Sequence, residues 1–300
     1  MPDLTYDWRV EAAVRHEDYS DFGKDLSTKL ATYLNVTDGL KLRASISDGF
    51  RAPALQQYAY SQSFSDFAAG QNIVRAIVPH GNAIVDALDI PALDAEKSLS
   101  YTFGLVLNPV DNLDITVDFY RIDIDDRIAI SGTFERSMLP SDVTAILPSR
   151  LQSVAFFTNA INTQTDGVDI VANYRQELGN DAEMKYNLAF SHNTTEVQSV
   201  NTPPGRLAEL GLEDVYFDAK ERIRIEDYSP ENRATLGGLY DAGDWEMGLT
   251  FNYYGEIVTA NSATDRSVDF TEGSGWITDI SGKYDVGNGL VLSGGAQRAP

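Results

Sequence analysis

Hydrophobic and polar residues alternate along most of this chain, in segments of roughly ten residues. Successive side chains of a β-strand point to opposite faces, so a period of two predicts strands with one apolar and one polar face. In residues 7–16, for example, Trp8, Val10, Ala12 and Val14 alternate with mostly charged residues. About eleven such segments follow one another along the chain, the last two at 276–284 and 290–294.

The connections between these segments alternate between short and long. Short connections lie near residues 38, 110, 179, 242 and 288, and their Gly, Asn and Asp residues supply the positive φ angles of tight hairpins. Long connections lack sustained alternation and indicate surface loops, at roughly 51–95, 124–165, 194–229 and 257–274. Such long loops are uncommon in compact soluble domains, whereas outer-membrane barrels have short turns at one rim and long loops at the other.

The pattern therefore predicts an all-β protein, an antiparallel up-and-down transmembrane β-barrel segment of about eleven strands that forms an open or partial barrel. We expect at least nine strands, each paired with its sequence neighbour, with the five short turns at one rim. The residues expected on the convex, lipid-facing side are Trp8, Val10, Leu42, Phe103, Leu105, Val117, Ile170, Leu188, Leu249 and Phe251. Those expected on the concave side are Arg9, Lys41, Arg43, Asp114, Asp118, Lys185 and Glu246.

Composition agrees with this prediction and narrows the possible partners. A mean hydropathy of -0.25 is typical of a soluble protein. A barrel has the same kind of average, because only alternate residues face lipid and the polar residues between them lower the mean. The formal net charge of -22, from 23 basic and 45 acidic residues, excludes nucleic acid as the expected partner, because phosphate binding needs a surplus of Lys and Arg. The acids Asp123, Asp125 and Asp126 lie beside Arg121 and Arg127, which favours local ion pairing over cation binding.

The chain offers no constellation for catalysis or metal binding. It has no cysteine, and its histidines, His16, His80 and His192, lack the spaced partners that zinc requires. The Gly237-Gly238 and Gly294-Gly295 pairs lie inside strand patterns, where glycine marks bends or bulges rather than phosphate sites. We therefore expect no catalytic residue, no metal, no cofactor and no enzyme activity.

Several motifs, in order along nearly the whole chain, resemble those of the TonB-dependent outer-membrane receptors. They are Arg15-His16-Glu17-Asp18-Tyr19, Gly49-Phe50-Arg51-Ala52-Pro53, Glu96-Lys97-Ser98, Asp118-Phe119-Tyr120-Arg121, Thr165-Asp166-Gly167-Val168-Asp169 and Pro230-Glu231-Asn232-Arg233. The resemblance implies a wall segment of a 22-stranded barrel that encloses a plug domain and lies in the cell outer membrane. It also implies three partners, namely TonB acting through the plug region, outer-membrane lipid with lipopolysaccharide, and a small-molecule nutrient.

No segment resembles the plug, no secretory signal is present, and the strand at 290–297 looks penultimate rather than final. We therefore expect residues 1–300 to be the C-terminal portion of such a barrel, truncated at both ends and unable to transport alone.

The expected function is uptake of a siderophore-iron complex, cobalamin or an oligosaccharide through a TonB-energised barrel, and the sequence does not choose among these ligands. The candidate ligand-path residues are Arg43, Asp48, Arg51, Tyr58, Asp118 and Asn173. Tyr58 lies among loop aromatics that could instead pack on one another. Two alternatives remain open, a porin-type diffusion channel and a secreted all-β binding or structural protein with two stacked sheets.

Overall fold

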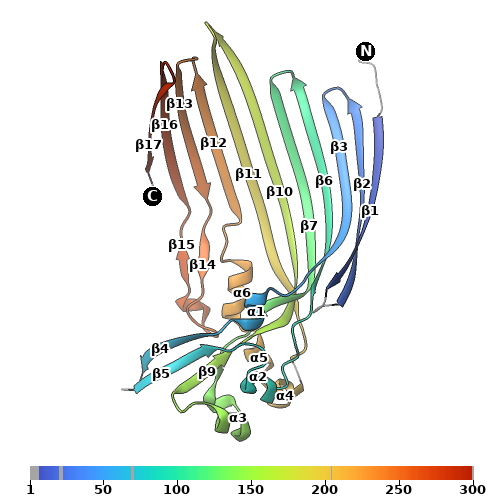
Figure 1. Cartoon of the computed structure of the whole chain (residues 1–300), viewed down its shortest axis with the longest axis vertical. Coiled ribbons are helices and arrows are strands. Elements are labelled where there is room, and N and C mark those ends of the chain that lie inside the picture. The colour runs from blue at the N-terminus through green and yellow to red at the C-terminus, as the bar shows by residue number, and fades with distance from the viewer. Residues whose placement is uncertain (1–6, 20–22, 69–70, 204, 299–300) are drawn as a thin grey trace.

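The computed structural model describes residues 7–19, 23–68, 71–203 and 205–298. Its main feature is one curved antiparallel sheet of eleven strands, in which every strand pairs with the next in sequence order (Figure 1). The strands are β1 (Asp7–Tyr19), β2 (Gly23–Thr37), β3 (Leu40–Arg51), β6 (Glu96–Val110), β7 (Leu113–Ile130), β10 (Phe157–Gly179), β11 (Ala182–Val200), β12 (Asn232–Asp241), β13 (Trp245–Tyr254), β16 (Gly275–Gly287) and β17 (Leu290–Arg298). The predicted up-and-down order is confirmed, and the stacked-sheet alternative is wrong.

The five predicted tight turns all lie at one end of the sheet, at the top of Figure 1. Asn180, Asp181 and Asn288 have φ values of 53°, 58° and 56°, which these residue types tolerate better than most others. Since all neighbouring strands are antiparallel and their number is odd, the two edge strands β1 and β17 run in the same direction.

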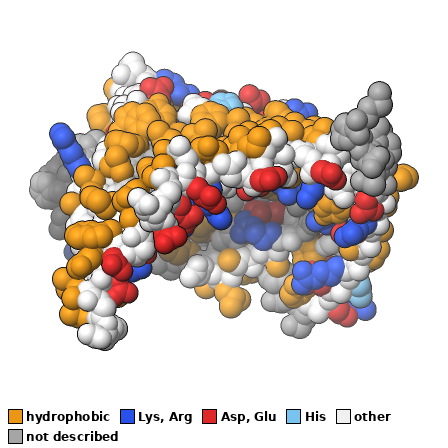
Figure 2. All heavy atoms as spheres, turned by 90° about the horizontal axis from the view of Figure 1, so that it is seen from above, with side chains coloured by type: hydrophobic (Ala, Val, Ile, Leu, Met, Phe, Trp, Pro, Cys, Tyr) orange, Lys and Arg blue, Asp and Glu red, His pale blue; other side chains and the backbone are white. Residues whose placement is uncertain are grey.

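Strand registers confirm the predicted division of the sheet into two faces. One row of directly paired residues crosses ten strands and is apolar throughout: Trp8, Leu34, Leu42, Leu105, Val117, Ile170, Phe190, Ala234, Tyr253 and Trp276. The adjacent row faces the other way and is largely polar: Arg9, Tyr33, Arg43, Gly104, Asp118, Asp169, Ser191, Arg233 and Tyr254. Seen from above, hydrophobic side chains line the outside of the curve and charged side chains gather within it (Figure 2).

Aromatic pairs mark both ends of the apolar band on the outer face. Trp245 contacts Tyr284 near the turns, with ring centroids 4.3 Å apart, and Tyr253 contacts Trp276 near the loops, at 5.0 Å. Trp245 and Tyr253 are eight residues apart on β13, so they are separated by about 26 Å along the strand. Strand tilt shortens that distance along the membrane normal to about 20 Å, close to the apolar band of outer-membrane barrels.

The long connections differ from the prediction in their extent and in their internal order. β7 continues to Ile130, β10 begins at Phe157 and β11 continues to Val200, so two predicted loops shrink to residues 131–156 and 201–231. The acidic residues near the end of β7 interrupt the apolar/polar alternation, so the sequence pattern did not predict that the strand continues. Asp126, with a φ of 54°, lies where the pairing of β7 with β10 becomes irregular.

The loops fold together into a cap at the end of the sheet opposite the tight turns (Figure 1). The cap contains a four-stranded sheet in the order β4-β5-β9-β8, in which β5 and β9, from different loops, pair in parallel. Its strands are β4 (Gln62–Ala68), β5 (Gln71–Ile77), β8 (Phe134–Glu135) and β9 (Leu151–Ala155), and a separate hairpin joins β14 (Ile257–Thr259) to β15 (Phe270–Glu272). Its helices are α1 (Leu55–Ala59), α2 (Ala83–Ala87), η1 (Arg136–Met138), α3 (Ser141–Ile146), α4 (Gly205–Glu209), α5 (Glu213–Tyr216), α6 (Ala219–Glu226) and η2 (Arg266–Val268). No helix in the described part of the chain is long and apolar enough to cross a membrane.

Candidate functional site: the inner wall and the loop cap

Arg43 and Asp118 form an ion pair that crosses an intervening strand on the inner face. Arg43 is on β3 and Asp118 is on β7, and the Nε and terminal nitrogen of Arg43 donate to the two carboxylate oxygens at 3.0 and 2.6 Å. The strand between them, β6, presents Gly104 at this row, and a Cβ there would overlap both side chains. The absence of a side chain at Gly104 therefore lets the pair lie flat against the wall.

Tyr120 lies flat in the same way, on the same face and two residues closer to the cap along β7. Its ring covers Gly167 of β10, where a Cβ would overlap the ring. Glycine inside a strand commonly marks such a close approach.

A shallow cavity of about 710 Å³ lies over this part of the inner wall. The polar side chains lining it are Lys29, Tyr33, Arg43, Ser45, Ser100, Thr102, Asp118, Tyr120 and Asp169. These groups can donate and accept hydrogen bonds from a polar solute or from a polar protein surface. Arg43 and Asp118, predicted separately from the sequence, are thus brought together in one cavity.

Arg51 and Glu96 form a second ion pair, where β3 and β6 enter the cap. Arg51 donates two hydrogen bonds of 2.5 Å to the carboxylate of Glu96, which also accepts the backbone N–H of Ile128 at 2.7 Å. The Glu96 side chain is 5% exposed and that of Arg51 is 55% exposed, so the acid is structural while the guanidinium still faces solvent. Arg51 is therefore available at the cap end of the wall.

Asn173 lies far along the wall from both ion pairs, near the tight turns. It pairs with Asp114 on β7 and Asn187 on β11 and lines a separate cavity of about 560 Å³. Charged neighbours in this cavity include Arg175 and Lys185. The structure thus places Asn173 on the inner face but not with Arg43 or Arg51.

Asp48 does not lie on the inner face, which corrects the sequence prediction for this residue. It pairs with Leu99 and shares the outer face with Leu42, while its carboxylate accepts hydrogen bonds from the backbone N–H and the hydroxyl of Thr28. Asp48 belongs to a polar belt on the outer face, immediately beyond the apolar band on the cap side. The same belt contains the ion pair between Arg121 and Asp166, with nitrogen–oxygen distances of 2.7 and 3.0 Å.

Tyr58 lies on the short helix α1 of the cap, not on the wall. Its ring is 5.4 Å from that of His80, and its carbonyl oxygen accepts the backbone N–H of His80 at 3.1 Å. Its neighbour Tyr60 makes an edge contact with Phe157 at 6.0 Å. Packing among loop residues therefore accounts for these aromatics, although Tyr58 remains partly exposed.

Arginines stabilise the cap both within a single loop and between loops. Arg136 donates three hydrogen bonds to the carbonyl oxygens of Thr144, Pro148 and Leu151. Arg206 of α4 pairs with Asp142 of α3, and this hydrogen bond lowers the pKa of the Asp142 carboxyl. Two of the long loops are joined by that pair.

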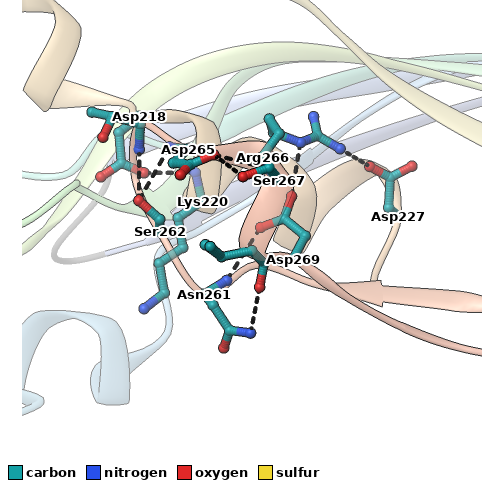
Figure 3. A network of polar contacts seen from close by, with 11 residues as sticks. Asp218, Lys220, Asp227, Asn261, Ser262, Asp265, Arg266, Ser267 and Asp269 are labelled. Carbon is teal, nitrogen blue, oxygen red and sulfur yellow. Dashed lines mark hydrogen bonds and ion pairs between the residues drawn. The ribbon is translucent and has the colours of Figure 1, made fainter.

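Helix α6 covers the part of β11 that extends beyond β12. The N–H of Val197 donates to the Glu226 carboxylate at 2.8 Å, and its carbonyl accepts from Arg222 at 3.2 Å. Figure 3 shows how the next loop joins this helix: Arg266 lies between Asp227, at 3.7 Å, and Asp269, at 2.9 Å. The side chains of α6 thus satisfy backbone groups that a neighbouring strand would otherwise pair.

The acidic cluster predicted beside Arg121 and Arg127 is held mainly by amide side chains. Asp123 accepts from Gln164 at 2.7 Å, and the carboxylate of Asp126 accepts from Asn201 at 3.0 Å. Among the residues that the structure describes, no group of three or more acidic or histidine side chains is arranged to hold a metal ion.

Three features of the wall escaped prediction from the sequence: the flat-lying Tyr120 and the glycines Gly104 and Gly167. A signal was present, because both glycines interrupt strongly alternating strands at polar-face positions. The partner that lies over each glycine is on a neighbouring strand and depends on register, which a single sequence does not reveal.

Comparison with known proteins agrees with this architecture. The family model described as TonB dependent receptor-like, beta-barrel matches residues 3–297. The vitamin B12 transporter BtuB of Photobacterium profundum is 28% identical over 123 residues, which are 41% of this chain and 16% of that protein. The ferric enterobactin receptor PfeA of Pseudomonas aeruginosa and the siderophore receptor PirA of Acinetobacter baumannii each superpose with a TM-score of 0.62 at 15% identity.

Both superpositions cover 96% of this chain, but only 37% of PfeA and 38% of PirA. The chain thus spans little more than a third of these solved structures, and at this identity the likeness concerns the fold. The family match, which extends over nearly the whole chain, agrees with the division into an apolar outer face and a polar inner face. The chain belongs to the TonB-dependent receptor-like β-barrel family of outer-membrane receptors and transporters.

Proposed function

We propose that this chain forms the wall and the loop cap of an outer-membrane receptor that takes up a small nutrient with energy delivered through TonB. The observation that carries the proposal is the pairing of a bilayer-compatible outer face with a polar inner face, capped by folded loops at one end only. A wall of this kind separates lipid from an aqueous path, and a folded cap presents fixed side chains to a solute that arrives from outside.

The ligand path in this proposal runs from the cap along the inner wall. Tyr58 and Arg51 lie near its entrance, Arg43 and Asp118 lie on its wall, and Asn173 lies near the turn rim. Asp48 is excluded from the path because it lies on the outer face.

The ligand class is a siderophore-iron complex, cobalamin or an oligosaccharide. The names of the relatives, which refer to vitamin B12 and to siderophores, support the first two of these ligand classes. The inner wall is compatible with each class, because hydroxyl and ionised groups both line its cavity.

The test uses the complete product of the gene that contains these residues, expressed in a host that lacks its own receptors for the probes. Uptake of a ferric catecholate labelled with ⁵⁵Fe and of ⁵⁷Co-labelled cyanocobalamin is measured with and without TonB, and a labelled maltooligosaccharide serves for the third ligand class. The proposal expects uptake of one probe that disappears when TonB is removed. Uptake that persists without TonB and rises linearly with probe concentration would instead identify a diffusion channel.

A further inference from the structure

The outer face contains an apolar groove at a position where a β-sheet would ordinarily present a continuous layer of side chains. Its cavity of about 420 Å³ extends over β11, β12, β13 and β16, and no charged side chain lines it. The row of paired residues through its centre is Tyr186, Gly238, Leu249 and Ile280. Gly238 alone in this row lacks a side chain, and it forms the floor of the groove.

Bulky side chains form the walls around Gly238. Leu236 lies on the cap side, Met247 lies on the turn side, and the methyl group of Met184 lies so near Gly238 that a Cβ there would be only 3.0 Å from it. Leu236, Met247 and Ile280 are half exposed or more, so their side chains stand out from the wall instead of collapsing over the glycine. Methionine is flexible and polarisable, which lets such a wall adapt to a partner of variable shape.

The position of the groove identifies the kind of molecule that fills it. Leu249 lies four residues from Trp245 and four from Tyr253, hence about 13 Å along the strand from each aromatic pair. The groove is therefore continuous with the lipid-facing surface and lies at the middle of the apolar band, where the bilayer offers only hydrocarbon. A polar ligand has no access to this depth without a large desolvation cost.

We propose that this groove holds one acyl chain of a phospholipid from the leaflet at the tight-turn rim. That leaflet is favoured because the turn-side wall, with Met184 and Met247, continues toward the aromatic pair of Trp245 with Tyr284. Aromatic side chains of this kind lie at headgroup level, so a lipid anchored there directs its tail toward Gly238. This inference is independent of which nutrient is carried.

The experiment reconstitutes the complete gene product in nanodiscs containing phosphatidylethanolamine with a diazirine near the end of one acyl chain. After illumination, peptides that carry attached lipid are mapped by mass spectrometry. We expect the label to concentrate on residues 236–249, several-fold above the equally apolar outer face around Phe103 and Phe119. Gly238→Leu fills the groove and should reduce that label several-fold. Ala172→Leu adds a similar bulk, smaller by one carbon atom, to the outer face outside the groove and should not reduce the label.

Three results would overturn the proposal. One is label spread evenly over the outer face of the unmodified protein, and another is an unchanged pattern in Gly238→Leu. The third is protein–protein crosslinks through residues 236–249 in place of lipid, which would make a second copy the occupant. If the Gly238→Leu variant fails to insert into the membrane, the distribution of the lipid label in the unmodified protein is the test. An even spread of label over the outer face refutes the proposed lipid site, and label concentrated at residues 236–249 supports it.

Discussion

The wall and the cap are stabilised in opposite ways. Nearly all the buried hydrophobic residues of the described chain belong to the cap and to the strand ends next to it, among them Val85, Leu88, Phe134, Val143, Phe156 and Tyr216. The wall has large apolar side chains too, but they are exposed: Trp8 is 69% and Ile280 is 56% accessible. The cap therefore carries its own core, whereas the wall requires lipid as the other half of its core.

This difference predicts that each region responds to a different kind of substitution. Substituting a buried cap residue by a smaller one should lower the stability of the cap, because nothing replaces the missing contacts. Substituting an outer-face wall residue by a smaller one should change the stability of the wall little, since lipid fills the space. Substituting it by a charged residue should destabilise the wall in the bilayer. The contrast can be tested by substitutions in the complete gene product in lipid.

The largest effect is expected from Phe134→Ala in the cap. Phe134 is fully buried and stacks on Phe156 with ring centroids 5.5 Å apart, so its truncation should cost about 3–5 kcal/mol of cap stability. Limited proteolysis should cut the cap faster, while the barrel keeps its resistance to unfolding by heat and detergent. Leu55→Ala is the matched control, because Leu55 is 79% exposed and should change neither readout. Simultaneous loss of cap and wall would show that the two are one cooperative unit.

The next effect is expected from Leu105→Arg in the wall. Leu105 lies in the apolar row on β6, so a charge there should cost about 2–4 kcal/mol in a bilayer. The yield of folded barrel after insertion into liposomes measures this cost. Val106→Arg places the same charge on the inner face and should cost less. Equal yields for the two variants would contradict the assignment of the faces.

A smaller effect is expected from Gly104→Ala, which sharpens the account of the inner wall. The added Cβ displaces Arg43 from Asp118, and loss of a partly exposed ion pair costs about 1 kcal/mol or less. The double variant Arg43→Ala with Gly104→Ala tests the cause, because no ion pair then remains for the new methyl group to break, and the unpaired Asp118 carboxylate is free to turn away from it. Its stability should therefore equal that of Arg43→Ala alone. If the losses of stability from Gly104→Ala and Arg43→Ala were additive in the double variant, the effect of Gly104→Ala would not act through the ion pair.

The smallest effect is a pH dependence confined to the cap. Burial raises the pKa of Glu221 on α6 above its value in the unfolded chain. The ionised form of Glu221 therefore destabilises the folded state. This destabilisation decreases as the pH falls through the raised pKa of the folded state, and it is absent below the pKa of the unfolded state. The Asp142 carboxyl has the opposite sign, since its pKa is lowered and its contribution is lost only in more acidic solution.

Hydrogen exchange measures this dependence. Amides of α6, corrected for intrinsic exchange rates, should be better protected at mildly acidic than at neutral pH, and Glu221→Gln should abolish the difference. Amides of the wall near Ile170 serve as the internal control. An identical pH dependence in Glu221→Gln would assign the effect to another group.

The contrast between wall and cap also explains how far the sequence predicts this molecule. The wall obeys local rules: a period of two assigns Val117 outward and Asp118 inward, and turn residues such as Asn180 mark where each hairpin reverses. The cap depends on contacts between distant loops, such as β5 with β9 or Arg206 with Asp142, and no local period encodes them.

The candidate site could be predicted from the sequence in part, less completely than the wall and more completely than the cap. Arg43 and Asp118 were predicted as inner-face residues from alternation, but their pairing depends on Gly104 and on the registers of three strands. Asp48, predicted as a ligand-path residue, has a position in the alternation of β3 that places it outward. There the apolar band ends, and a charge on the outer face lies at headgroup level instead of in hydrocarbon.

The most direct test of the two-faced wall is a cysteine scan along β7 from Leu113 to Arg121. Residues 1–300 contain no native cysteine. Any cysteine elsewhere in the complete gene product is replaced first, so that each variant reconstituted in liposomes carries one spin label. Collision rates with oxygen, which partitions into lipid, and with a water-soluble nickel chelate should alternate with a period of two, oxygen dominating at Ile115, Val117 and Phe119. At Arg121 the alternation of collision partners should end, as the strand leaves the apolar band. Equal access of the nickel chelate to Val117 and Asp118, or dominance of oxygen at Asp118, would contradict the division of the wall into a lipid-facing and a polar face.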